Sequence, residues 1–320
     1  MQKLTLISGG AGFIGSHLCD KLIRLGYKVI AADNLLTGNS ENIAHLERHQ
    51  DFEFLKWDVT KPSPKPLPKK LDFIYHLASP ASPNPKSKIS YLQFPLETIE
   101  VNTIGTKNLL ELAQKTKARF LFASTSEIYG NPQIHPQVEN YFGNVNPFCL
   151  RACYDESKRL GETIVFVYFE KFGVDARVVR IFNTYGSRMN LDDERVIVNF
   201  IYQALKNKPI TIYGDGSYTR SFCYVDDLVD GLFKAMEKSG TKGQVLNLGN
   251  PDERTILAAA KLIKKLTKSR SEIVFEKQIE GDVEKRRPDI TKAKKILGWE
   301  SKTSFEEGLK KMIEFYQKSL

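Results

Sequence analysis

Tyr154 and Lys158 are separated by four positions in a stretch with helical periodicity, so both side chains fall on one face of a helix. Such a pair can move a proton to or from an alcohol. An ammonium group beside a phenol favours the phenolate, so we expect Lys158 to lower the pKa of Tyr154 from about 10 toward neutral pH. The same spacing also occurs where an exposed aromatic ring rests on a lysine side chain. Other features of the chain must decide between these interpretations.

A glycine-rich turn near the N-terminus favours the chemical interpretation. The apolar run 4–7 predicts a buried strand, glycines recur through residues 9–15, and residues 16–25 have helical periodicity. Strand, turn and helix in this order form the setting of a dinucleotide fingerprint, in which backbone N–H groups at the helix N-terminus bind a pyrophosphate. The predicted cofactor contacts in this turn are Gly9, Gly12, Phe13, Ile14 and Gly15.

An acidic residue at the end of the second predicted strand indicates which dinucleotide is bound. Residues 28–32 lead into Asp33 and Asn34, 18 positions after Gly15. A carboxylate there binds both ribose hydroxyls and repels a 2′-phosphate, and Asn34-Leu35 offers no arginine to receive one. The sequence therefore predicts a site for NAD rather than NADP.

The order of elements predicts an α/β fold. Apolar strands alternate with helical segments through residue 185, as in a doubly wound parallel sheet (Rossmann fold), and shorter strands and helices follow. With 320 residues, 41% hydrophobic and 27% charged, the chain is long enough for two globular parts. We predict an NAD-binding domain over 1–185 and a mainly substrate-binding domain over 186–320, with segments near 221–248 returning to the Rossmann sheet.

The strand ends supply further candidate residues, because the carboxyl ends of parallel strands converge on one crevice. Additional strands are predicted at 52–56, 73–77, 119–123 and 176–182. The residues after them include candidates for contacts to adenine and to the phosphates, and a polar run beside the reacting centre. These are Asp58 and Val59, then Leu77, Ala78 and Ser79, then Ser124, Thr125, Ser126 and Glu127.

Composition argues against several other classes. The four cysteines form no Cys-x-x-Cys pair, so we expect free thiols and no metal. No apolar run is long enough to span a bilayer and no signal-type segment is present, so no membrane partner is expected and the cytoplasm is the expected compartment. The net charge of +9 is dispersed and no nucleic-acid-binding module is recognisable, which favours a polyanionic small substrate over nucleic acid.

Across nearly its whole length the chain resembles the extended short-chain dehydrogenases/reductases and, among them, the UDP-glucuronate decarboxylase (UDP-xylose synthase) family. The resemblance rests on a combination of motifs whose single members are shared more widely. These are Asp33-Asn34-x-x-Thr37-Gly38, His76-Leu-Ala-Ser-Pro-Ala-Ser-Pro83, Ser124-Thr-Ser-Glu-x-Tyr-Gly130, Gly143-Asn-Val-Asn-Pro147, Arg151-Ala-Cys-Tyr-Asp-Glu156, Arg180-Ile-Phe-Asn-Thr-Tyr-Gly186, Thr219-Arg-Ser-Phe-Cys-Tyr-Val225 and Arg286-Arg-Pro-Asp-Ile290.

The resemblance implies a cycle on UDP-glucuronate. NAD takes hydride from C4 while Tyr154 takes the hydroxyl proton, the resulting 4-keto acid loses carbon dioxide, and hydride returns to give UDP-xylose. Thr125 would hydrogen-bond the C4 oxygen, and Lys158 would bind the nicotinamide ribose. Glu127 would position the sugar and order a water or proton donor. Arg286 would contact the sugar carboxylate.

Further contacts are also implied by the resemblance. Thr37 and Gly38 would bind the cofactor, and a homodimer would form through helices that include 107–113 and 154–172. Two departures from the family pattern are Ser187, where a proline is usual, and a longer, more basic segment at 84–95. The implied contacts to the UDP-sugar are Asn108, Asn183, Arg195, Asn199, Tyr213, Arg220 and Arg286.

Ser126 separates this chain from one group of relatives. Sugar-nucleotide 4,6-dehydratases carry an Asp-Glu pair here, because one acid must protonate the leaving hydroxyl. A neutral serine cannot readily do so, whereas decarboxylation needs no base at C5. The alternatives left open are a decarboxylase that releases the 4-keto pentose, an epimerase or 4,6-dehydratase, and a non-catalytic NAD-binding regulator. The presence of Thr125, Tyr154 and Lys158 disfavours the regulator.

Overall fold

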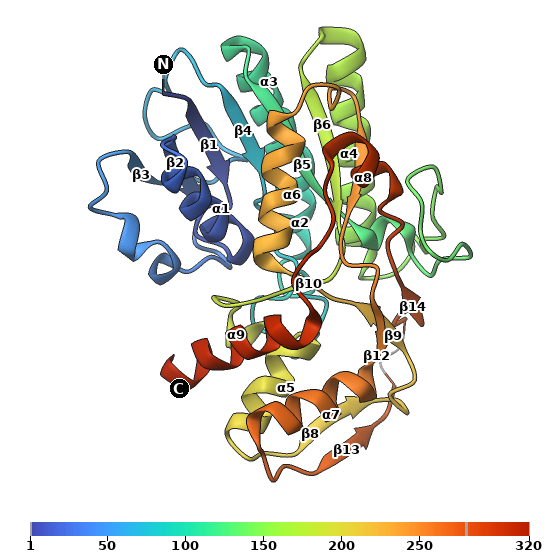
Figure 1. Ribbon diagram of the computed structural model, residues 1–320. Coiled ribbons are helices and arrows are strands. Elements are labelled where there is room, and N and C mark those ends of the chain that lie inside the picture. Colours follow the sequence, from blue (N-terminus) through green and yellow to red (C-terminus); the bar gives the residue numbers. More distant parts are fainter. Residues whose placement is uncertain (1, 279–280, 320) are drawn as a thin grey trace.

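A seven-stranded parallel sheet forms the centre of the protein (Figure 1). The computed structural model describes residues 2–278 and 281–319. The strand order β11-β6-β5-β4-β1-β2-β3 confirms the predicted doubly wound fold, with its direction of winding reversed between β1 and β4. The strands are β1 (Leu4–Ser8), β2 (Lys28–Asp33), β3 (Phe52–Lys56), β4 (Phe73–His76), β5 (Arg119–Thr125), β6 (Ala176–Ile181) and β11 (Val245–Leu248).

Helices cover both faces of this sheet. Alternation of side chains along β5 shows why, because Leu121 enters one hydrophobic core while Phe120 and Phe122 enter the other. One face packs against α1 (Phe13–Arg24) and α6 (Val225–Glu237), with α8 (Thr291–Leu297) beside them. The other packs against α3 (Thr106–Thr116) and α4 (Ala152–Phe172). A short helix α2 (Pro95–Glu100) and a π-helical turn η3 (Val101–Gly105) lead into α3.

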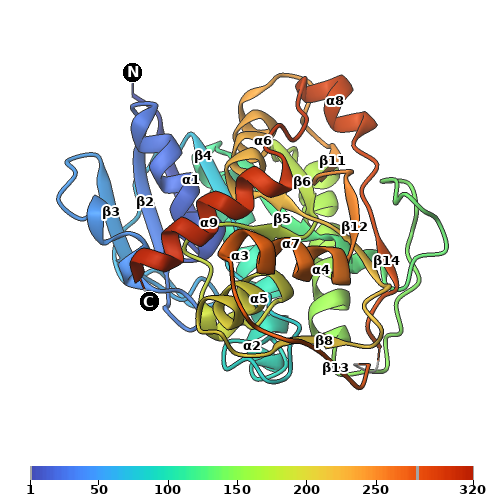
Figure 2. The same cartoon turned by 60° about the horizontal axis from the view of Figure 1, so that its bottom comes forward.

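The smaller lobe lies beyond the carboxyl ends of the strands, at the bottom of Figure 1 and toward the viewer in Figure 2. It contains a two-stranded parallel sheet, a three-stranded sheet and three helices. The two-stranded sheet pairs β8 (Ile210–Tyr213) with β13 (Ile273–Glu276). The three-stranded sheet has the order β12 (Glu253–Thr255), β9 (Thr219–Ser221) and β14 (Lys285–Arg286). The helices are α5 (Val196–Leu205), α7 (Ile256–Thr267) and α9 (Phe305–Ser319).

The chain passes between the two lobes more than once. Of the segments near 221–248, α6 packs on the main sheet and β11 pairs with β6 at its edge. Residues 223–224 do not join that sheet. They form β10 (Cys223–Tyr224), which pairs with β7 (Thr184–Tyr185), because the outer edge of β6 is already occupied by β11. The remaining elements are short 3-10 turns: η1 (Ser40–Asn42), η2 (Ala44–Leu46), η4 (Ser126–Tyr129) and η5 (Leu191–Asp193).

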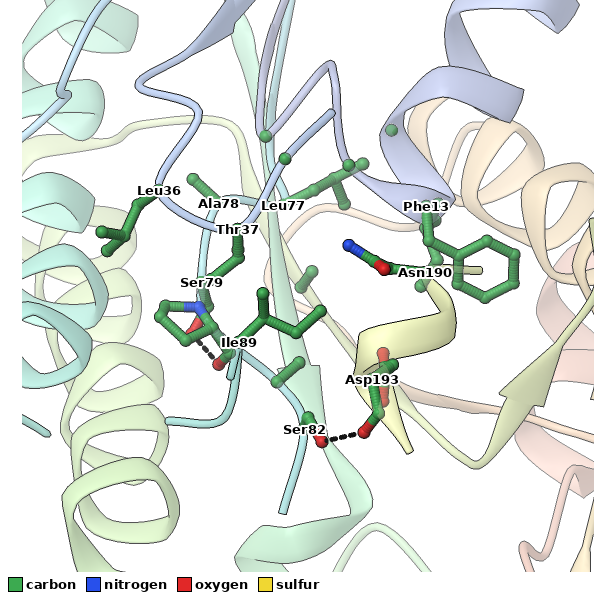
Figure 3. A pocket seen from close by; sticks show the side chains of 18 of the residues that line it. Phe13, Leu36, Thr37, Leu77, Ala78, Ser79, Ser82, Ile89, Asn190 and Asp193 are labelled. Atoms are coloured by element: carbon green, nitrogen blue, oxygen red, sulfur yellow. Dashed lines mark hydrogen bonds between the residues drawn. The ribbon is translucent and has the colours of Figure 1, made fainter. Parts of the chain in front are cut away.

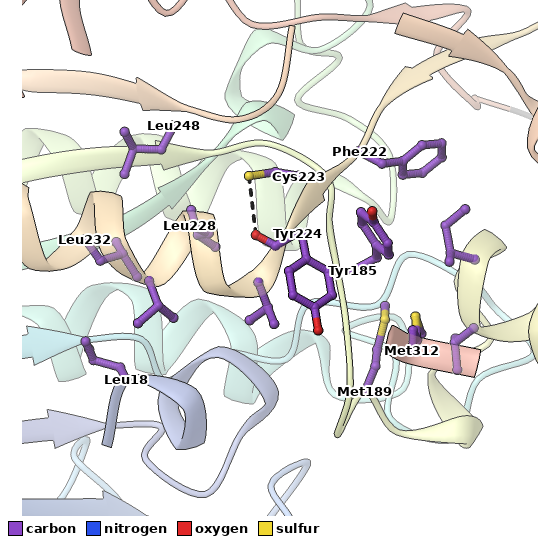
Figure 4. Close-up of a cluster of buried hydrophobic side chains, with 14 of the residues drawn as sticks. Leu18, Tyr185, Met189, Phe222, Cys223, Tyr224, Leu228, Leu232, Leu248 and Met312 are labelled. Atoms are coloured by element: carbon purple, nitrogen blue, oxygen red, sulfur yellow. Dashed lines mark hydrogen bonds between the residues drawn. The ribbon is translucent and has the colours of Figure 1, made fainter. Parts of the chain in front are cut away.

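One hydrophobic core is continuous across the lobes. Figure 4 shows Leu18 of α1 and Leu228 of α6 in the same cluster as Tyr185, Phe222 and Met312 from the junction and the smaller lobe. The two lobes are therefore packed on each other by buried apolar side chains. None of the helices in the described ranges combines the length and apolar character needed to cross a membrane.

Candidate active site

A cavity of about 1060 Å³ runs along the carboxyl ends of the central strands, between the lobes (Figure 3). In Figure 3, Phe13, Leu77 and Thr37 approach it from the Rossmann side, while Asn190 and Asp193 approach from the other. Every predicted cofactor contact lines this cavity: Gly9, Gly12, Phe13, Ile14, Gly15, Asp33, Asn34, Thr37, Gly38, Asp58, Val59, Leu77, Ala78, Ser79, Tyr154 and Lys158.

The glycine turn has the close backbone packing that a pyrophosphate site requires. Gly9 adopts a positive φ of 78°, and a Cβ atom on Gly15 would collide with the carbonyl oxygen of Gly9. Gly12 is the N-cap of α1 and no side chain caps this end of the helix. The N–H groups of the first turn are thus left to bind an anion from the cavity.

Asp33 is held at the end of β2 by the backbone. Its carboxylate accepts hydrogen bonds from the N–H groups of Ala11 at 3.0 Å and Leu35 at 2.8 Å. Burial raises the pKa of Asp33, and these two N–H groups oppose the rise. A Cβ atom on Gly38 would lie against the same carboxylate, so the following loop can pass close to it only as glycine. The arrangement fits an adenosine ribose with two free hydroxyls.

Thr125, Tyr154 and Lys158 come together at the end of β5 and the start of α4. The Thr125 side chain hydrogen-bonds the Tyr154 phenol. Lys158 donates to the carbonyl oxygen of Ala123 at 2.7 Å, and its Nζ lies 5.7 Å from the centre of the Tyr154 ring. The three side chains are buried and face the cavity, an arrangement suited to proton transfer at an alcohol.

The predicted electrostatic effect of Lys158 on Tyr154 is wrong for this geometry. Burial raises the pKa of Tyr154, the hydrogen bond from Thr125 opposes this, and Lys158 is not among the largest causes of the shift. Burial also lowers the pKa of Lys158 to about 7, with Glu162 acting in the opposite direction. A lysine that is only partly charged near neutral pH attracts a phenolate weakly, which explains the difference from the sequence prediction.

Two arginine side chains form ion pairs with the carboxylate of Glu127. Nη1 of Arg286 donates to one carboxylate oxygen, and Nη2 of Arg151 donates to the other at 2.5 Å. Burial alone would raise the pKa of Glu127, but Arg286 and Arg151 lower it to about 2. Glu127 is therefore ionised, and the two guanidinium groups place positive charge at the junction of the two lobes. Ser126, buried beside Glu127, also lines the large cavity.

A second cavity of about 180 Å³ continues from the first into the smaller lobe. Arg195 lines both cavities and forms a two-point ion pair with Asp193, both contacts being 2.6 Å. Arg220 pairs with Asp282 at 2.8 Å. The residues predicted to bind the UDP-sugar that line this second cavity are Asn183, Arg195, Asn199, Tyr213, Arg220 and Arg286.

Asn108 is the exception among the predicted substrate contacts. Its side-chain amide donates to the carbonyl oxygen of Val59 at 2.9 Å, and the residue lines neither cavity. It lies on α3, behind the wall of the larger cavity, so it supports a predicted cofactor contact. The proposed contact of Asn108 with substrate has no support in this geometry.

Two residues at the site were not singled out from the sequence. Arg151 precedes Tyr154 by three positions in a motif that was recognised, so the helical spacing was a usable signal. Tyr91 packs face to face on Tyr154, with ring centres 4.8 Å apart and an angle of 4° between the planes. It lies within the longer segment at 84–95, where no residue spacing indicated a role. In the part of the chain that the structure describes, no group of His, Cys, Asp or Glu side chains could hold a metal ion.

Comparison with known proteins places this geometry in a familiar context. The family model of GDP-mannose 4,6 dehydratase matches residues 6–312. The chain is 50% identical over 319 residues to UDP-glucuronic acid decarboxylase 1 of Danio rerio, covering 100% of this chain and 74% of that protein. It is also 50% identical over 313 residues to UDP-glucuronic acid decarboxylase 5 of Arabidopsis thaliana, covering 98% and 89%.

A solved structure resembles the whole fold. UDP-glucuronic acid 4-epimerase from Bacillus cereus, in complex with UDP-glucuronic acid and NAD, superimposes with a TM-score of 0.88 at 29% sequence identity. The match covers 99% of this chain and 100% of that one.

Proposed function

The chain belongs to the GDP-mannose 4,6 dehydratase family of extended short-chain dehydrogenases/reductases, and on that premise we propose that it converts UDP-glucuronate to UDP-xylose and carbon dioxide. The observation that carries the proposal is identity of 50% over nearly the whole chain to UDP-glucuronic acid decarboxylases from an animal and a plant. The cavity residues support the proposal with groups for NAD binding, for proton transfer at C4 and for binding the sugar carboxylate.

The oxidation and its reversal occur at C4 of the sugar. The glycine turn and Asp33 would hold NAD, which when bound would accept a hydride from this carbon and return it. Tyr154 removes the proton from the C4 hydroxyl and gives it back in the reverse step, while Thr125 holds the oxygen in place. Lys158 lines the same cavity and would bind the nicotinamide ribose. The position of the three side chains in one cavity supports these assignments.

Loss of carbon dioxide follows from the chemistry of the oxidised sugar. A ketone at C4 stabilises the electrons left at C5 as an enolate, so the carboxylate can depart without a base at C5. The Arg286 guanidinium can orient the sugar carboxylate, and Glu127 can order the donor that protonates C5. Ser126 adds no acid, which suits decarboxylation better than dehydration.

The second cavity is assigned to the UDP group. Arg195 and Arg220 supply positive charge for a diphosphate, and α5 begins at Val196 with its N-terminus at this cavity. Tyr213 and Asn199 also line this cavity and would contact the uracil ring. The substrate would then span both cavities, with its sugar between Tyr154 and Arg286.

The direct test is incubation of the purified protein with UDP-glucuronate. We expect one carbon dioxide per substrate consumed, a product with the mass of UDP-xylose, and no net NADH absorbance. Stoichiometric NADH and a 4-keto pentose would favour the alternative decarboxylase that releases its oxidised product. Conversion to UDP-galacturonate without carbon dioxide would instead identify an epimerase.

The assembly is proposed to be a homodimer in the cytoplasm. Large apolar side chains are exposed along η3 and α4, a pattern that fits an interface between two copies: Ile104, Leu160, Phe166 and Val167. All four cysteines are unpaired, and Cys149 is exposed, which agrees with a reducing compartment.

A further inference from the structure

The ring of Tyr91 packs directly on the ring of Tyr154, the proposed proton carrier. Its ring lies parallel to the Tyr154 ring, with centres 4.8 Å apart, and it is fully buried. The hydroxyl of Tyr91 has no hydrogen-bond partner among residues 2–278 and 281–319. An offset parallel stack restricts tilting of both rings. Tyr91 therefore contacts Tyr154 through its aromatic ring and not through a hydrogen bond of its hydroxyl.

The segment that carries Tyr91 forms a closed loop, residues 82–91, which we call the strap. The Tyr91 N–H donates to the carbonyl oxygen of Ser82 at 3.2 Å, and the Ser90 hydroxyl donates to the same oxygen at 2.8 Å. Beyond the ring stack, the Cys153 thiol donates to the carbonyl oxygen of Tyr91 at 3.7 Å. Both ends of the strap are thus fixed beside α4.

The strap is also anchored to the opposite wall of the cavity. Three of its side chains donate to consecutive backbone carbonyls: Ser87 to Asp192 at 2.5 Å, Ser82 to Asp193 at 2.7 Å, and Asn84 to Glu194 at 3.0 Å. Figure 3 shows the contact between Ser82 and Asp193. The strap therefore bridges the two lobes, and one of the backbone carbonyls that anchor it, that of Glu194, directly precedes Arg195.

We propose that Tyr91 is a positioning residue, which holds the Tyr154 ring in the orientation needed for proton transfer, and that the strap fixes the position of Tyr91. This inference rests on the proposed function. The phenol of Tyr154 must present its oxygen to the C4 hydroxyl, and rotation of the ring about its side-chain bonds moves that oxygen away. The stack with Tyr91 opposes this rotation, and the contacts of the strap with 192–194 keep Tyr91 in place.

Two substitutions separate the ring from the hydroxyl. Tyr91→Leu removes the stack, so kcat with UDP-glucuronate should fall about 10- to 100-fold, with a smaller change in KM, because misplacement of a reacting group mainly slows the chemical step. Tyr91→Phe keeps the stack, so kcat should remain within about threefold of wild type. Bound NAD should be unchanged in both variants.

The pH profile of kcat provides a readout that simple loss of stability would not change. Burial raises the pKa of Tyr154, so the space opened by Tyr91→Leu should admit water and move the acidic limb of the profile to lower pH. The other charges that act on Tyr154 are Glu127, Arg195 and Asp155, and both variants retain them. Tyr91→Phe should keep the wild-type profile.

Tyr75→Leu is the matched control. Tyr75 is also fully buried, and its hydroxyl has no partner in the part of the chain that the structure describes, but it lies in β4 and lines neither cavity. This control should lower the melting temperature without lowering kcat. If Tyr91→Leu does not fold, Ser87→Ala tests whether the strap fixes Tyr91. This substitution removes the hydrogen bond from Ser87 to the Asp192 carbonyl oxygen, and Ser87 lines neither cavity. It should reduce kcat severalfold and shift the profile in the same direction.

The outcomes distinguish this inference from the proposed function. An inactive wild-type protein would refute decarboxylation. With an active wild type, unchanged kcat and pH profile in Tyr91→Leu, or in Ser87→Ala where the first variant is unfolded, would overturn the role of Tyr91. An equal loss of kcat in Tyr91→Phe and Tyr91→Leu would also overturn it, because the hydroxyl rather than the stack would then be responsible.

Discussion

Arg286 and Glu127 lie 159 positions apart in the sequence, yet Nη1 of Arg286 donates a hydrogen bond to Oε1 of Glu127. Glu127 follows the end of β5 in the Rossmann part, and Arg286 ends β14 in the smaller lobe. The ion pair therefore joins the two lobes at the place where the sugar carboxylate would bind. The charged part of the site is complete only when both lobes are in contact.

Arg286→Ala should reduce decarboxylation by about 100-fold or more, because it removes the carboxylate contact and leaves Glu127 with one arginine. Removal of one partner of a buried pair should also lower the free energy of unfolding, by about 3 kcal/mol. Carbon dioxide release and denaturant unfolding measure the two effects. Arg287→Ala, at the neighbouring position outside both cavities, is the control. A wild-type rate in Arg286→Ala would remove this arginine from the mechanism.

Tyr154→Phe should lower the rate of C4 oxidation by about 10²- to 10⁴-fold, because the general base is lost while the ring remains. NAD should stay bound, since the glycine turn and Asp33 are unchanged. Single-turnover measurements with UDP-glucuronate, together with release of NAD from denatured protein, test both statements. Tyr75→Phe removes a buried, unpartnered hydroxyl elsewhere and should retain full activity. Normal turnover by Tyr154→Phe would rule out the tyrosine as base.

Lys158 should make stability depend on pH in a defined window. Its pKa is about 7 in the folded protein, below the usual 10.5, so between these values the unfolded chain binds a proton that the folded protein does not. The free energy of unfolding should therefore rise with pH in this range, by at most about 1.4 kcal/mol per unit from this group. Lys158→Met should lack this contribution.

Urea unfolding of wild type and Lys158→Met at pH 7, 8 and 9 measures the difference. We expect the wild type to gain stability relative to the variant as pH increases. Lys265→Met, which removes an exposed lysine of α7, should keep the wild-type slope. Parallel pH dependences for wild type and Lys158→Met would show that the buried lysine is charged across this range.

Phe166→Asp should convert the proposed homodimer to a monomer, because a carboxylate at a buried apolar interface is left without a partner. The side chain of Phe166 is 59% exposed on α4. Phe275, on β13, is 55% exposed and provides a matched control in Phe275→Asp, which should leave the dimer intact. Light scattering measures the mass of each variant. A monomeric wild type, or a dimeric Phe166→Asp variant, would contradict the proposed interface.

The cofactor half of the site was predictable because it depends on local patterns at strand ends. The glycine turn follows β1 and Asp33 ends β2, and parallel topology brings such positions together without further information. All of the predicted cofactor contacts consequently line one cavity. The strand and helix order was predictable for the same reason, since hydrophobic periodicity is read over short windows.

The remaining features depend on burial and on long-range packing. Lys158 has a lowered pKa because it is enclosed, and enclosure cannot be read from its spacing to Tyr154. The pairing of Arg151 with Glu127 needs the start of α4 and the turn after β5 to meet in space. Tyr91 reaches Tyr154 only through the closed shape of the strap, which no periodic pattern encodes.

The return of the chain to the main sheet at β11 limits how such a protein can change its substrate. Helix α6 and strand β11 belong structurally to the nucleotide-binding part but lie between segments of the smaller lobe in the sequence. The smaller lobe is therefore not a contiguous cassette that recombination could exchange at one junction. New specificity in this architecture is more accessible through point changes and loop insertions at the crevice.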